Sequence, residues 1–140
     1  MMRKMQVRPT TVTVDLAAIR HNLGVVRRLA AGRSICGLVK ADAYGHGLVP
    51  VASTLAQAGV DFLAVALVEE GVTLRQSGID TPILVLGGAL DGAYETLVAE
   101  RLPPVIFRHE HLNGLAGAAG STAVDFHLKV DTGMARLGLQ

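Results

Sequence analysis

The sequence predicts an α/β protein in which parallel strands alternate with helices. From Ile35 onward, short apolar runs and helical segments follow one another at a period of roughly 20 to 25 residues, which is typical of βαβ units. The apolar runs are continuous, as expected for strands that helices cover in a parallel sheet. Glycine or proline stands at many of the boundaries between segments. We therefore expect about five parallel strands.

A short strand and a helix open the chain. Thr11 to Val14 is a β-branched run that predicts a strand. Asp15 stands at an N-cap position, and apolar residues follow at helical spacing from Leu16 to Leu29. Gly32 lies just past the end of this predicted helix, where glycine is favoured.

The later elements follow from the same signals. Strands are predicted at Ile35 to Ala41, Phe62 to Leu67, Ile83 to Leu86, Val105 to Phe107 and Ala123 to Asp131. Helices are predicted at Val51 to Ala58 with Pro50 in the first turn, Glu69 to Gln76, Asp91 to Glu100 and His109 to Ala119. Gly114 and Gly117 weaken the last helix.

Composition excludes several classes of function. Thirteen basic and 12 acidic residues leave a net charge of +1, without the electrostatic footprint of a nucleic-acid or membrane-surface protein. Cys36 has no intrachain partner, which favours a reducing cytoplasm. No apolar core follows Arg3 and Lys4, so no signal peptide is expected, and no apolar run is long enough for a membrane span. His109 and His111 lack zinc-ligand spacing, so we expect no metal.

Strand number alone leaves the architecture open. A doubly wound sheet can be built from five strands, whereas a (β/α)₈ barrel needs eight strands and about 250 residues. The glycine patterns that usually support nucleotide binding on a doubly wound sheet are absent from the sequence.

The first candidate site surrounds Lys40. The amine stands at the end of an apolar strand, where it is costly unless neutralised, paired or covalently used. Tyr44 follows, and Gly45 and Gly47 flank His46 in a loop that can approach a ligand closely. A cofactor site and a snorkelling surface lysine beside a turn are both compatible with this pattern. Period-two alternation puts Cys36 on the face of Lys40, as a small buried hydrophobe rather than a reactive thiol.

The second candidate site surrounds Lys129. Alternation puts His127, Lys129 and Asp131 on one face, which needs partners or a ligand on an interior strand but is solvated on an edge strand. Arg136 follows Gly133 and can clamp a carboxylate or phosphate, although taken alone it is more typical of an arginine on a helix surface. Glu69 and Glu70 are interpreted only as first-turn acids favoured by the helix dipole.

Both sites resemble those of the alanine racemases. VKADAYGHG, Val39 to Gly47, is similar to the cofactor-lysine motif of that family, and HLKVDTGMARLG resembles its second signature. The resemblance implies a (β/α)₈ barrel followed by a β-rich domain. Residues 1–34 would then be the strand and helix leading into the barrel, and residues 35–140 its first part, an incomplete barrel of about five parallel strands.

The resemblance also implies a chemistry. Lys40 would form a Schiff base with pyridoxal 5'-phosphate and act as one racemisation base, and Tyr44 would bind the phosphate. Lys129 would be carbamylated and hold Arg136, which would contact the cofactor's phenolic oxygen and the substrate carboxylate. The implied function is interconversion of L- and D-alanine, which supplies D-alanine for peptidoglycan, in a homodimer whose second subunit supplies a tyrosine base. Ala135 departs mildly from the family pattern, which often has a polar residue or glycine there.

A half barrel would leave unpaired strand edges and an uncovered inner face. We therefore expect residues 1–140 alone neither to racemise alanine nor to fold stably, with Thr11 to Val14 unpaired. The alternatives are a racemase for another amino acid such as serine, a non-catalytic barrel that binds pyridoxal phosphate, and a fragment with no function of its own.

Overall fold

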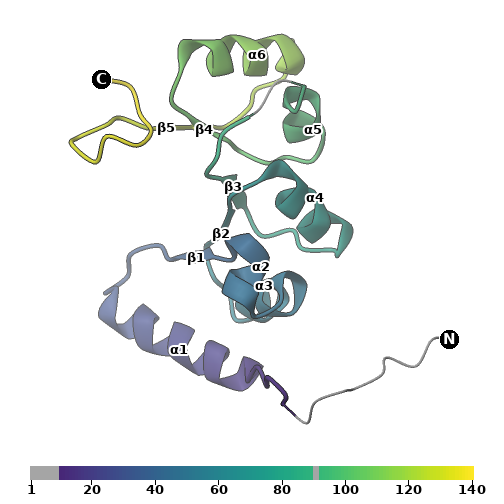
Figure 1. The fold of residues 1–140 in the computed structure, drawn as a ribbon, viewed down its shortest axis with the longest axis vertical. Helices are drawn as coiled ribbons and strands as arrows, with labels where there is room; N and C mark the ends of the chain where they lie inside the picture. Colours follow the sequence, from purple (N-terminus) through teal and green to yellow (C-terminus); the bar gives the residue numbers. More distant parts are fainter. Residues whose placement is uncertain (1–9, 90–91) are drawn as a thin grey trace, which may run out of the picture.

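The computed structural model describes residues 10–89 and 92–140 and arranges them as parallel strands with helices packed along one side (Figure 1). The expectations about Arg3, Lys4 and the first residue of the helix predicted from Asp91 lie outside these residues. The helices are α1 (Leu16–Leu29), α2 (Lys40–Gly45), α3 (Leu48–Gln57), α4 (Val68–Gln76), α5 (Tyr94–Ala99) and α6 (His109–Ala119). The strands are β1 (Cys36–Leu38), β2 (Phe62–Val65), β3 (Ile83–Val85), β4 (Val105–Ile106) and β5 (His127–Leu128).

All the strand pairs are parallel. Strands β1, β2 and β3 pair in sequence order, with Leu38 opposite Ala64, and β4 pairs with β5. The two groups meet at a parallel bridge between Val85 and Pro104, where the Val85 N–H donates to Pro103 O at 2.9 Å. The predicted alternation of parallel strands and helices is confirmed, and the sheet is not closed in the part that the structure describes.

The core lies between the strands and the helices. Leu63, Val65, Ile83 and Val85 are fully buried, and residues of α3, α4 and α5 pack against the same cluster. Gly37 on β1 brings the backbone close to α3, since a Cβ there would lie 3.0 Å from Leu55 Cδ1. The helices therefore bury one face of the sheet by apolar contact, the main favourable contribution to folding.

The opposite face of β1 and β2 is open. Cys36 and Phe62 are partners in the register, and both are exposed, as is Leu38. The prediction that Cys36 is buried is therefore wrong. Alternation puts it with Leu38 on the face that none of the helices in residues 10–89 and 92–140 covers, while Val39, whose side chain is fully buried, lies on the other side.

Helix α1 has the predicted bounds. Asp15 caps it, because Oδ1 accepts the N–H groups of Ala17 and Ala18 at 2.8 and 3.1 Å. The strand predicted at Thr11 to Val14 is not formed. Val12 is 88% exposed, and the described part of the chain offers the β-branched run no neighbouring strand with which to form a ladder.

Most of the other elements differ from prediction at their ends. Helix α6 has the predicted bounds, α3 begins earlier, and the strands are shorter than the apolar runs. The largest difference is at Ala123 to Asp131, where only His127 and Leu128 form a strand. None of the helices among residues 10–89 and 92–140 has the length and apolarity to cross a membrane.

Candidate functional site

Lys40 lies at the carboxyl end of β1. The ladder continues one residue past the strand, because the Val39 N–H donates to Ala64 O of β2 at 2.9 Å. Lys40 follows directly, is half-buried and begins α2. Lys40 therefore lies past the carboxyl end of a parallel strand, the end at which α/β proteins position functional groups.

The segment labelled α2 is a left-handed turn. Ala41, Asp42, Ala43 and Tyr44 have φ between 52° and 55° and ψ between 40° and 54°. Non-glycine residues in this conformation cost about 1–2 kcal/mol each. Sequence patterning predicts a glycine loop here, in which Gly45 and Gly47 let the backbone approach a ligand closely. Both glycines do have positive φ, of 80° and 96°, but the structure also puts a left-handed backbone on the four residues after the lysine.

Hydrogen bonds hold the turn. The Ala43 N–H donates to Val39 O at 2.8 Å, and Asp42 Oδ1 accepts the N–H of Leu48 at 2.6 Å, which joins the turn to the start of α3. His46 Nδ1 lies 3.0 Å from the carbonyl oxygens of both Ala43 and Tyr44. Carbonyl oxygens only accept, so Nδ1 is the protonated ring nitrogen in this arrangement.

Glu70 is the residue that sequence reasoning missed. Its Oε1 accepts the N–H of Ala41 at 2.7 Å, and its Oε2 accepts the N–H groups of Ala66 and Leu67 at 2.8 and 3.1 Å. The interpretation of Glu70 as only a first-turn acid is therefore wrong. The sequence contained one signal for this role. Glu70 follows shortly after the end of β2, the neighbour of β1, and neighbouring parallel strands end at the same edge of a sheet.

Tyr44 presents its side chain to solvent from the last left-handed position and is 58% exposed. Within residues 10–89 and 92–140, neither the Lys40 amine nor the Tyr44 hydroxyl makes a hydrogen bond or an ion pair. Both groups can therefore bind a ligand without first breaking a contact in this part of the protein.

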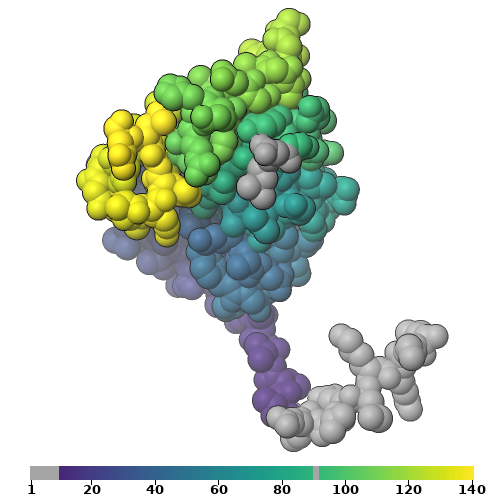
Figure 2. Space-filling model, turned by 45° about the horizontal axis from the view of Figure 1, so that its top comes forward, coloured from purple at the N-terminus to yellow at the C-terminus, as the bar shows by residue number. Residues whose placement is uncertain are grey.

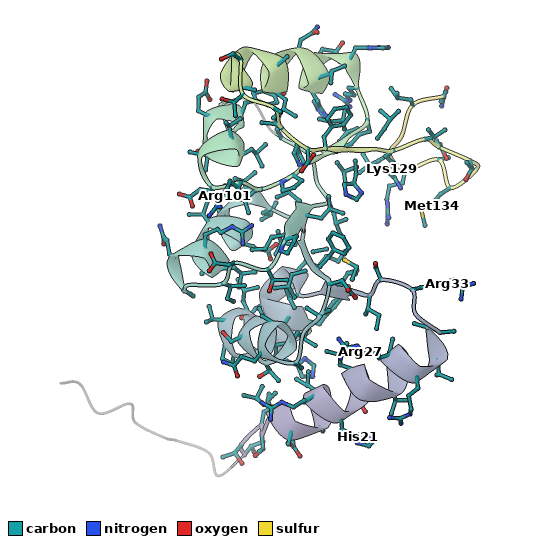
Figure 3. The ribbon with its side chains drawn as sticks, turned by 180° about the vertical axis from the view of Figure 1, so that it is seen from behind. His21, Arg27, Arg33, Arg101, Lys129 and Met134 are labelled. Atoms are coloured by element: carbon teal, nitrogen blue, oxygen red, sulfur yellow. The ribbon has the colours of Figure 1, made fainter. Side chains whose placement is uncertain are left out.

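Lys129 lies just past β5 with its backbone fixed on both sides. Its N–H donates to Ile106 O at 2.8 Å, and its carbonyl accepts the Leu139 N–H at 2.9 Å. Among the described residues β5 pairs with β4, and His127 is exposed. Figure 3 shows Lys129 and Met134 on the opposite side of the strands from Arg101.

Asp131 organises the turn that follows Lys129. Its Oδ1 accepts the N–H groups of Gly133 and Ala135 at 2.9 and 3.0 Å. These two backbone hydrogen bonds are the main cause that lowers the pKa of Asp131, and the charge of Lys129 adds to the effect. Because the whole sheet is parallel, this turn and the Lys40 turn lie at the same edge, separated by β2, β3 and β4. Among the described residues, no hydrogen bond or ion pair joins the Lys40 and Lys129 groups directly.

The family described as "Alanine racemase, N-terminal domain" matches residues 14–140, a span that contains both groups. The chain belongs to this family. It is 48% identical to the alanine racemase of Symbiobacterium thermophilum over 95% of the chain and 46% identical to that of Halothermothrix orenii over 99%. It spans only 36% and 38% of those two proteins, so it corresponds to little more than a third of their length.

Solved alanine racemases have the same arrangement of strands and helices. The enzyme from Clostridium difficile superposes with a TM-score of 0.86 at 39% identity, covering 93% of this chain and 37% of that one. The Bacillus anthracis enzyme, solved with bound L-Ala-P, gives a TM-score of 0.83 at 34% identity, covering 91% and 33%.

Position 135 is where this relative of the alanine racemases departs from the family pattern. Ala135 has a φ of 56°, a conformation in which a side chain is strained and glycine is not. Arg136 follows it and is exposed, without a side-chain hydrogen bond or ion pair to the rest of residues 10–89 and 92–140. The C-terminal residues form a yellow lobe at one side of the molecule (Figure 2). The Asp131 turn thus holds the backbone just before an accessible guanidinium.

Proposed function

We propose that this chain supplies the first part of the (β/α)₈ barrel of an alanine racemase, with residues 1–34 leading into the barrel and residues 35–140 forming its first strands and helices. The observation that carries the proposal is the family match over residues 14–140, which includes the Lys40 turn and the Lys129 segment. The uncovered apolar face at Leu38 and Phe62 agrees with a sheet that further elements complete.

Lys40 is the residue that would hold pyridoxal 5'-phosphate covalently, and Tyr44 would donate a hydrogen bond to its phosphate. The cofactor needs a primary amine for its aldehyde and polar donors nearby. The residues fit these needs, because the amine of the half-buried Lys40 and the hydroxyl of the exposed Tyr44 come from one short turn and make no competing polar contact with residues 10–89 and 92–140.

Lys129 and Arg136 would form the second half of the site. We propose that Lys129 Nζ takes up carbon dioxide and loses a proton, which converts the amine into a carbamate anion that suits the Arg136 guanidinium. The fixed backbone of Lys129 and the exposed head of Arg136 support these roles. Arg136 would then reach the phenolic oxygen of the cofactor and the substrate carboxylate.

The proposed reaction is the interconversion of L- and D-alanine, which supplies D-alanine for peptidoglycan. When bound, pyridoxal phosphate spreads the negative charge that remains on the α-carbon after its proton leaves. Lys40 Nζ would accept or return that proton on one face of the α-carbon, and Arg136 would orient the carboxylate. We propose a cytoplasmic homodimer as the working form.

Reductive trapping tests the assignment of Lys40. The chain is incubated with pyridoxal phosphate and treated with borohydride, and the modified lysine is located by peptide mass spectrometry. We expect the label on Lys40 rather than on Lys4 or Lys129, the other lysines in the sequence. Lys40→Ala should lose this label, and Lys129→Ala should keep it. Labelling spread evenly over the lysines would contradict the proposal.

Proton exchange tests the reaction separately. In heavy water, a polypeptide that racemises alanine with pyridoxal phosphate replaces the α-proton of alanine by deuterium. The exchange should disappear in Lys40→Ala. Faster exchange on serine than on alanine would identify a racemase for another amino acid. Because residues 1–140 alone are expected not to racemise alanine, Lys40 labelling without exchange is the expected result for them. It would favour a non-catalytic cofactor-binding barrel only in a chain completed with the rest of the barrel and the β-rich domain.

A further inference from the structure

Glu70 connects the ends of two neighbouring strands. Its carboxylate accepts the N–H groups of Ala66 and Leu67, where β2 leads into α4, and also the N–H of Ala41, 29 residues earlier in the chain. Strands β1 and β2 are paired in register up to Leu38 and Ala64. The Glu70 side chain therefore bridges the carboxyl edge of the sheet just beyond the last paired residues.

The hydrogen bond between Glu70 and the Ala41 N–H lies where the left-handed turn begins. Ala41 is the first left-handed residue and directly follows Lys40. Its N–H would otherwise need water or another acceptor, and a hydrogen bond to a charged carboxylate is about twice as strong as one between neutral groups. The adjacent Glu69 is exposed, which makes it a matched reference.

We propose that Glu70 is a positioning residue for Lys40. Through the Ala41 N–H it holds the left-handed turn against β2, and so keeps the Lys40 amine at the edge of the sheet. The use of that amine by a cofactor rests on the proposed function, whereas the clamp on the turn does not. Glu70 itself acts only through the backbone.

Three variants separate this role from general stabilisation. Glu70→Ala removes all the acceptors. Glu70→Gln keeps one carbonyl oxygen, so it can satisfy one strand end but not both. Glu69→Gln changes the charge of the same helix turn and leaves the clamp intact.

Amide hydrogen exchange without cofactor tests the clamp. In Glu70→Ala we expect exchange over residues 41–45 to accelerate by about tenfold or more, the loss expected for a hydrogen bond to a charged group, with α1 unchanged. Glu70→Gln should lie between that variant and the original chain, and Glu69→Gln should match the original. Unchanged exchange at residues 41–45, or equal acceleration throughout the chain, would overturn the proposal.

Borohydride trapping with pyridoxal phosphate tests the positioning. The measured quantity is the ratio of labelling at Lys40 to labelling at Lys129 in the same molecule. We expect this ratio to fall at least several-fold in Glu70→Ala and less in Glu70→Gln. An unchanged ratio despite faster local exchange would overturn the positioning role. If the original chain shows no preference for Lys40, the proposed function fails, and the exchange measurement still decides whether Glu70 clamps the turn.

Discussion

Gly114 of α6 lies directly against the aromatic ring of Tyr94 at the start of α5. A Cβ at position 114 would overlap Cε2 and Cζ of that ring, whereas a Cβ at Gly117 would meet nothing within 4 Å. Both glycines lower the helix propensity of α6, but only one of them is required by packing. The two positions therefore form a matched pair for separating propensity from contact.

We expect alanine to have opposite effects at these two positions. Gly117→Ala should raise the free energy of unfolding by about 1 kcal/mol, because alanine is the better helix former. Gly114→Ala should lower it by about 1–3 kcal/mol, since the added methyl group displaces the Tyr94 ring. Thermal unfolding followed by circular dichroism measures both effects. Equal gains at the two positions would contradict the close contact.

Glycine at position 135 should stabilise the turn before Arg136. Ala135 has a φ of 56°, which costs an L-residue about 1 kcal/mol or more and glycine nothing. Ala135→Gly should therefore raise the free energy of unfolding by about 1 kcal/mol. Ala116→Gly, at an exposed position inside α6, is the control and should lower it by about 1 kcal/mol. Unfolding midpoints that move in the same direction for the two variants would rule out this explanation.

The Asp131 turn should loosen in acid. The pKa of Asp131 is lowered in the folded protein by the N–H groups of Gly133 and Ala135, so its contribution to stability is present above the unfolded pKa of about 4. That contribution is lost as the pH falls through the lower, folded pKa. We expect the amide signals of Gly133 and Ala135 to follow this titration in NMR spectra. In Asp131→Asn, which cannot titrate, the same signals should stay constant over this pH range.

The Cys36 thiol should react slowly at neutral pH despite its exposure. Partial burial raises the pKa of this thiol, so a smaller fraction is present as the nucleophilic thiolate. Alkylation by iodoacetamide, measured against pH, should have its midpoint above that of the same chain in urea. A midpoint below the unfolded value would indicate an activating charge near Cys36 and contradict the effect of burial.

The sequence predicted helices α1 and α6 with their observed bounds because their signals are local. Asp15 caps α1 through atoms two and three residues away, and apolar spacing defines the length of each helix. Strand ends were less predictable, since a strand lasts only as long as its neighbour pairs with it. Ile35 to Ala41 is apolar almost throughout, but its pairing with β2 ends shortly after Leu38.

The candidate site was predicted in position but not in conformation. Lys40 at a strand end follows from an apolar run and a glycine loop. The left-handed backbone from Ala41 to Tyr44 does not, because none of these residue types favours positive φ strongly enough to signal four in succession. Nor does the Glu70 clamp, whose contact with Ala41 depends on two strands lying side by side.

The left-handed turn has one consequence for the handedness of its residues. The dihedral angles of Ala41 and Ala43 are close to the mirror image of those in an ordinary right-handed helix. D-alanine placed at either position by chemical ligation would therefore adopt the helical conformation that it prefers. The turn, which costs energy with L-alanine, would then be favoured at that position. Beside its proposed cofactor lysine, this relative of the alanine racemases has a backbone that favours D-alanine over the L-alanine it contains.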